Sequence, residues 1–104
     1  MEFRVLRYFL AVAREQSISA AAQALHLTQP TLSRQLRELE EELGKQLMVR
    51  GSRRIELTED GMLLRKRAEE IMELVSRTQA ELSSPDAAVT GDVYIGTGET
   101  DGVR

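Results

Sequence analysis

The sequence contains no cysteine and only one histidine, His26. Without cysteine the chain can form neither a disulfide framework nor a thiolate metal site, which is compatible with the cytoplasm, the location we expect. His26 has no second histidine and no obvious carboxylate partner, so its position favours a surface turn residue over a metal ligand or catalytic base. The apolar runs are only a few residues long, too short to span a bilayer. We therefore expect no metal, no cofactor and no membrane contact.

The chain also lacks an overall positive charge, since its formal net charge is −3. The charges are unevenly distributed: residues 1–67 contain 12 Lys or Arg against 9 Asp or Glu, whereas residues 68–104 contain 2 against 8. A phosphate backbone responds to charge at the contact surface, so the negative total does not exclude a nucleic-acid partner. A length of 104 residues allows one small domain with an extension.

The first predicted helix follows from apolar residues at a spacing of three and four. The stripe consists of Phe3, Leu6, Leu10 and Ala13, widened by Phe9 and Val12. Arg4 and Arg7 interrupt this apolar segment, so a core helix is a better interpretation than a signal sequence.

Two further helical patterns surround a tight break between Ser17 and Arg34, which predicts a helix-turn-helix. Ser19 is the expected N-cap of a helix near Ala20–Leu25, whose alanines let a neighbouring helix approach closely. His26 and Leu27 form the expected turn.

Thr28 is the expected N-cap of the third helix, and Pro30 falls in its first turn, where a missing N–H is harmless. Gly44 is the expected C-terminal stop. The buried stripe of this helix is predicted to be Leu32, Leu36, Leu39 and Leu43. The acidic run Glu38–Glu42 is interpreted as a solvated face, because phosphate would repel it.

The next segment predicts a β-hairpin. Leu47 and Val49 alternate with polar or longer residues, as do Ile55 and Leu57, around a tip that contains Gly51. The tip region is basic, with Arg50, Arg53 and Arg54 close together. A helix-turn-helix followed by such a hairpin is typical of a winged helix.

A long fourth helix is predicted from Thr58-Glu59-Asp60 to about Leu82, where Ser83-Ser84-Pro85 reads as a stop. It spans about 25 residues, or roughly 38 Å. Gly61 lies in its first turn, where low helix propensity does least harm. One face carries a heptad seam of Leu64, Ala68, Ile71, Val75, Thr78 and Leu82. So small a domain cannot bury the whole seam, so we expect a homodimer through this helix.

The last segment, residues 85–104, has a different character. Asp92-Val93-Tyr94-Ile95-Gly96 predicts a β-strand, with Gly-Thr-Gly at its end. The third glycine of a dinucleotide-binding turn is absent, because Asp101 stands there, so cofactor binding is disfavoured. We expect residues 1–58 to form a winged helix-turn-helix domain, 59–84 a linker and dimerisation helix, and 85–104 a hinge with the first strand of a further, truncated domain. The predicted fold class is mainly α, with three helices, a two-stranded wing and the long helix.

Taken together, these residues resemble the N-terminal DNA-binding region of LysR-type transcriptional regulators from about Phe3 to Gly61. The matching positions are Ala21, Ala22, Leu25, Thr28, Gln29, Pro30, Leu32, Ser33, Leu39, Glu40, Leu43, Gly44, Leu47, Arg50, Arg53, Leu57, Thr58 and Gly61. Met48 departs from the usual phenylalanine and Asp60 from the usual alanine. Methionine fills a similar volume and aspartate suits a first helical turn, so neither change affects the DNA-reading positions.

The resemblance implies a sequence-specific regulator that binds double-stranded DNA, with the third helix in the major groove and the wing at the minor groove or backbone. The expected DNA-binding residues are Thr28, Gln29, Pro30, Thr31, Ser33, Arg34, Arg50, Arg53 and Arg54. Arg50 has an equally good interpretation as a structural residue that bonds across the hairpin. A dimer would read an interrupted inverted repeat, and a full-length protein would form a tetramer. A small-molecule effector is expected only where the family's effector-binding domain is present.

The main alternative is a protein-interaction module in which the winged helix is an assembly surface and the long helix an oligomerisation rod. The basic wing and the polar start of the third helix favour DNA over protein as the partner. An enzyme is a distant third interpretation, because the chain offers no plausible pair of nucleophile and base.

Overall fold

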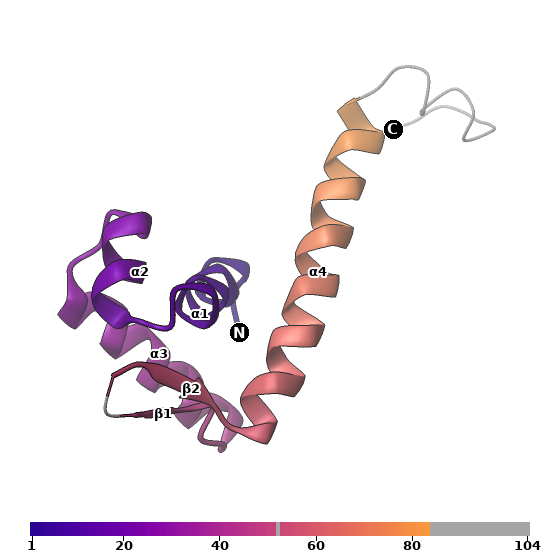
Figure 1. Cartoon of the computed structure of the whole chain (residues 1–104). Coiled ribbons are helices and arrows are strands. Elements are labelled where there is room, and N and C mark those ends of the chain that lie inside the picture. Colours follow the sequence, from indigo (N-terminus) through magenta and orange to yellow (C-terminus); the bar gives the residue numbers. More distant parts are fainter. Residues whose placement is uncertain (52, 84–104) are drawn as a thin grey trace. The chain divides into compact units, whose positions relative to one another are not determined.

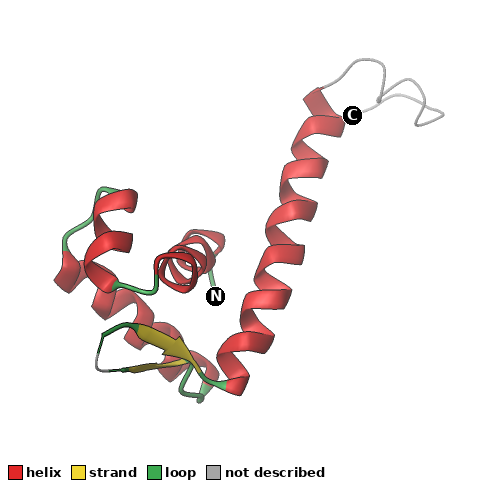
Figure 2. Cartoon of the chain, viewed as in Figure 1, coloured by secondary structure: helices red, strands yellow, loops and turns green. Residues whose placement is uncertain are grey.

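The computed structural model describes residues 1–51 and 53–83. Within these residues, four helices and one antiparallel hairpin follow one another (Figures 1 and 2). The elements are α1 (Phe3–Glu15), α2 (Ile18–Leu25), α3 (Gln29–Leu43), β1 (Met48–Arg50), β2 (Ile55–Leu57) and α4 (Glu59–Ser83). The predicted fold class is confirmed. The chain divides into two compact units, Met1–Met72 and Glu73–Arg104. None of the described helices is long and apolar enough to cross a membrane.

Helix α1 buries three of the six residues predicted for its apolar face, Leu6, Phe9 and Val12. Its buried residues are Val5, Leu6, Phe9, Ala11 and Val12. Phe3 is 55% exposed, which corrects its place in the buried stripe, and Leu10 and Ala13 are half-buried at the margin of that stripe. Phe3 is the first residue of the helix, where no preceding turn covers its side chain.

Helix α2 begins two residues earlier than predicted. Ser17, not Ser19, is the N-cap: it has extended backbone angles, and its hydroxyl accepts a hydrogen bond from the Ala20 N–H at 3.0 Å. Ile18, which precedes the predicted helix start near Ala20, is the first residue of α2 and is buried. Ala21 and Ala22 are buried, as expected for a close helix crossing.

The turn between α2 and α3 is formed as predicted. His26 is exposed and has a left-handed backbone, with φ of 59°, and its N–H caps the end of α2. The Leu27 N–H donates to the Ala22 carbonyl at 2.9 Å, and the Leu27 side chain packs against the core. This pairing of a left-handed cap with an apolar residue after it closes the helix end and sets the direction of α3.

Helix α3 has the predicted caps at both ends. The Thr28 hydroxyl accepts a hydrogen bond from the Thr31 N–H, and Gly44 ends the helix with a φ of 68°. Leu32, Leu36 and Leu39 are buried in the core. Leu43 was wrongly included in this stripe, since it is 37% exposed in the last turn of the helix.

The wing is a short hairpin in which Met48 pairs with Leu57 and Arg50 with Ile55. The Gly51 N–H donates to the Arg54 carbonyl at 2.8 Å and closes the tip. The Ile55 N–H donates to the Gln16 carbonyl at 2.9 Å, which ties the wing to the end of α1. Leu47 and Ile55 are buried, whereas Val49 is 40% exposed.

The start of α4 is fixed by Thr58 and Gly61. The Thr58 hydroxyl accepts from the Gly61 N–H at 3.0 Å and donates to the Gln46 carbonyl at 2.6 Å. Gly61 is buried, and a Cβ atom at this position would overlap the carbonyl oxygen of Leu47. Glycine is thus required for close packing here, a stronger reason than the tolerance for low helix propensity expected from the sequence.

The predicted seam of α4 has unequal exposure along the helix. In the first unit, Ala68 is fully buried within the single chain, while Leu64 and Ile71 are half-buried. The methyl group of Ala68 has no surface left for a partner, which corrects its place in the dimerisation set. In the second unit, Val75 is half-buried and Leu82 is 81% exposed. The predicted hinge and strand, residues 85–104, lie outside the described residues.

Candidate nucleic-acid interface

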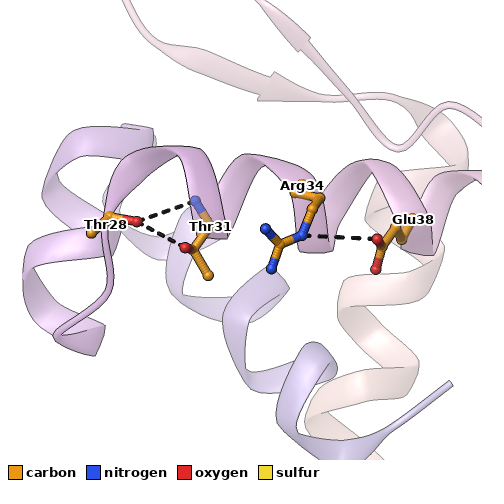
Figure 3. A network of polar contacts seen from close by, with 4 residues as sticks. All are labelled: Thr28, Thr31, Arg34 and Glu38. Carbon is orange, nitrogen blue, oxygen red and sulfur yellow. Dashed lines mark hydrogen bonds and ion pairs between the residues drawn. The ribbon is translucent and has the colours of Figure 1, made fainter.

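The N-terminal turn of α3 carries a network of two threonines (Figure 3). The Thr28 hydroxyl accepts from the Thr31 N–H at 3.3 Å and donates to the Thr31 hydroxyl at 2.8 Å. Thr28 is therefore engaged as a cap. Thr31 accepts that bond, so its own hydroxyl proton is available for an acceptor outside the protein.

The residues around this network reach the surface. Gln29 and Pro30 are exposed, and Thr31 and Ser33 are half-buried. Gln29 stands at the first position of α3, where the helix N–H groups and the helix dipole favour anions and polar acceptors. An exposed amide at this place can form the paired hydrogen bonds that an adenine edge offers.

Arg34 lies one turn further along the same helix and is also exposed. Its guanidinium faces Glu38, with Nε 3.9 Å from the carboxylate Oε2, and both side chains are more than half exposed (Figure 3). An exposed pair of this spacing is weak, because water screens both charges. Arg34 can therefore exchange Glu38 for a phosphate or a guanine edge.

The wing arginines lie next to the start of α3. Arg50, Arg53 and Arg54 are exposed, and all three line one hollow together with Gln29. We call this the wing-tip hollow; its other lining residues are Gln16, Ser17, Ile18, Ser19, Gly51 and Ile55. The fold thus brings together two groups of expected site residues that are about 20 positions apart in the sequence. Within residues 1–51 and 53–83, none of the three arginines forms an ion pair, so their charge faces solvent.

A second hollow adjoins the first and shares Ile18, Arg50 and Ile55 with it. We call it the α3–β1 hollow; it is also lined by Ser33, Leu36, Arg37, Glu40, Gln46, Met48 and Val49. Arg37 is exposed on α3 and was missed in the sequence. Its position four residues after Ser33, on the same helix face, was the signal that could have found it.

Glu40 was also misinterpreted as part of a solvated acidic face. It is half-buried, and its Oε2 accepts the N–H of Leu47 at 2.7 Å and that of Met48 at 3.4 Å. Its charge is thus compensated by backbone amides at the entrance to β1. The other acids of the run, Glu38, Glu41 and Glu42, are exposed, as expected.

No group of three or more His, Cys, Asp or Glu side chains in the described chain could hold a metal ion. The assembled surface consists instead of a capped helix start, polar side chains that reach solvent and several arginines. Such a surface offers hydrogen bonds to base edges and positive charge to phosphates.

The known proteins that this chain is similar to are bacterial transcriptional regulators. Residues 3–62 match the family model of the bacterial regulatory helix-turn-helix proteins, lysR family. The transcriptional regulator BsdA of Bacillus subtilis is 41% identical over 98 residues, which cover 93% of this chain and 34% of that protein. The regulator BudR of Klebsiella aerogenes is 41% identical over 101 residues, covering 97% of this chain and 71% of that protein. The chain therefore spans about a third of the length of BsdA.

Among solved structures, the crystal structure of the BenM_DBD/catB site 1 DNA complex is similar, with a TM-score of 0.77 and 44% identity. The match covers 80% of this chain and 93% of that one. These relatives are transcriptional regulators, and none of these comparisons supports the alternative of a protein-interaction module.

Proposed function

We infer that this chain, which belongs to the lysR family of bacterial regulatory helix-turn-helix proteins, binds double-stranded DNA sequence-specifically and so regulates transcription. The observation that carries the proposal is the wing-tip hollow, where Gln29 and three arginines line one surface. A helix start with an amide and a hydroxyl can read base edges, while the adjacent arginines neutralise phosphates. No catalytic role is proposed.

In this proposal α3 enters the major groove with its N-terminal turn. Gln29 bonds to an adenine edge, and Pro30 or Thr31 contacts a thymine methyl group. Ser33 and Arg34 reach bases or phosphates. Arg53 and Arg54 approach the minor groove or its phosphates from the wing, and Arg50 joins them. The open side chain of Arg50, without a described bond across the hairpin, favours this role over the structural one.

Affinity and site length are proposed to come from pairing of two chains through α4. One domain reads only a few base pairs, whereas a dimer places two α3 helices on successive turns of one DNA face, about 34 Å apart. Half-buried Leu64, Ile71 and Val75 remain available for this contact. Exposed Leu82 and Thr78 extend it, and the Thr78 hydroxyl is already bonded to the Leu74 carbonyl at 2.7 Å.

A salt titration on duplex DNA tests the proposal. If a dimer neutralises about 6–8 phosphates, its affinity falls by about 10³–10⁴ between roughly 50 and 200 mM salt. Fluorescence anisotropy with a random duplex and with a duplex selected from a random pool measures both the slope and the preference. An affinity that does not change with salt contradicts the proposal.

Two variants distinguish base recognition from phosphate neutralisation in the same assay. Gln29→Ala is expected to lower the preference for the selected duplex by about 1–3 kcal/mol at one base pair. Arg54→Ala is expected to weaken both duplexes alike. Equal losses on both duplexes for Gln29→Ala would remove Gln29 from the reading role.

A further inference from the structure

The α3–β1 hollow contains two arginines from different elements. Arg37 comes from the middle of α3 and Arg50 from the end of β1, and both line this hollow. Neither the family resemblance nor the proposed reading set assigns a role to Arg37. We propose that Arg37 is a further DNA-binding residue which, together with Arg50, holds a backbone phosphate of the duplex. This inference rests on the proposed function.

The hydrogen bonds of Glu40, the acidic residue that lines the hollow, favour an anion as the ligand. The Glu40 carboxylate accepts hydrogen bonds from the Leu47 and Met48 amides. It forms no described ion pair with Arg37 or Arg50. Within the described ranges 1–51 and 53–83, Arg37 and Arg50 have no ion-pair partner at all. The hollow therefore presents two guanidinium groups whose donors can bind the oxygens of a phosphate.

The position of Arg37 along α3 favours the backbone over the bases. Arg37 lies eight residues after Gln29, which is roughly 12 Å along the helix axis. This distance is about the width of the major groove. If the start of α3 reads base edges, Arg37 reaches the rim of the groove, where the phosphates run. The hollow adjoins the wing-tip hollow through Arg50, so both bind one continuous stretch of DNA.

The test compares three full-chain variants for binding to a random duplex at several salt concentrations. Arg37→Gln removes the charge, Arg37→Lys keeps it, and Arg4→Gln is the matched control. Arg4 is exposed, forms an ion pair with Glu2 and lines a hollow that shares no residue with the α3–β1 hollow or the wing-tip hollow. Thermal unfolding by circular dichroism verifies that each variant is folded.

For each bound chain, we expect Arg37→Gln to weaken binding about tenfold and to reduce the slope of log affinity against log salt by about 1. Arg37→Lys retains most of the slope, and Arg4→Gln retains the wild-type affinity and slope. The loss in Arg37→Gln is the same on random and selected duplexes.

Two results would overturn the assignment of Arg37. One is a wild-type slope in a folded Arg37→Gln variant; the other is a loss confined to the selected duplex, which would mean base reading. Failure of the proposed function is distinguishable from either, because the wild-type chain would then show no salt-dependent duplex binding.

Discussion

Arg34 has an acidic neighbour that competes with any anion it could bind. The Glu38 carboxylate lies 3.9 Å from the Arg34 guanidinium and also adds a negative charge to the exposed surface of α3. An ion pair of this spacing contributes about 0.3–0.5 kcal/mol to a helix. DNA binding through Arg34 must break this ion pair. It must also bring phosphates close to the Glu38 carboxylate, which repels them.

Replacing this acid should therefore strengthen DNA binding. Glu38→Gln is expected to raise affinity for a random duplex about twofold or more, because it releases Arg34 and removes a repulsive charge. Anisotropy titration at low salt measures the change. Glu73→Gln is the matched control, since it removes the same charge from an exposed position on α4. An affinity for Glu38→Gln no higher than that of Glu73→Gln would contradict the expectation.

At the scale of elements, the wing and α3 are joined by one carboxylate. Glu40 belongs to α3, while the two N–H groups that it accepts belong to Leu47 and Met48 at the entrance to β1. Leu47 is 1% exposed, so its amide has little access to water if the carboxylate is removed. A buried donor without an acceptor is costly, so we expect this contact to help hold the wing against α3.

We expect Glu40→Ala to lower the free energy of unfolding by about 1–3 kcal/mol, since it leaves the Leu47 N–H unsatisfied. Glu40→Gln keeps an acceptor oxygen and is expected to lose less. Urea denaturation followed by circular dichroism measures both. Glu41→Ala, at the exposed neighbouring position, is expected to change stability by less than about 0.5 kcal/mol. Equal stability of the Glu40→Ala and Glu41→Ala variants would show that the contact with the wing is unimportant.

At the scale of the whole molecule, the proposed function needs two chains to associate on one DNA site. The first unit already covers Ala68, so the proposed contact must come from the apolar residues of α4 that stay accessible. Exposed Leu74 and Leu82, with half-buried Ile71 and Val75, supply such residues. Apolar side chains spaced along a helix in this way favour a second helix over water.

Ile71→Glu is expected to convert a dimer into monomers, because the seam would have to bury a charge without a partner. Size-exclusion chromatography with light scattering measures the mass. Ala80→Glu introduces the same charge at an exposed position of α4 outside the seam and is expected to leave the dimer intact. A dimer that persists in Ile71→Glu would contradict pairing through this seam.

Several features of the chain were predictable from the sequence because local interactions determine them. The helix starts at Thr28 and Thr58, the stop at Gly44 and the hairpin around Gly51 depend on capping and turn chemistry within a few residues. Exposure of the Gln29 side chain follows from its place before the buried stripe of α3.

Other features were decided only when the elements packed together. Periodicity predicts that a helix has a buried face, but the neighbours determine which residues at its margins are covered; Phe3 and Leu43 are exposed for this reason. Glu40 and Gly61 gain their roles from contacts with Leu47, which lies outside the helix of either residue. Arg37 and Arg50 likewise line one hollow only because the wing folds beside α3. Sequence spacing fixes short-range geometry, whereas long-range contacts follow from the burial of apolar surface by the whole domain.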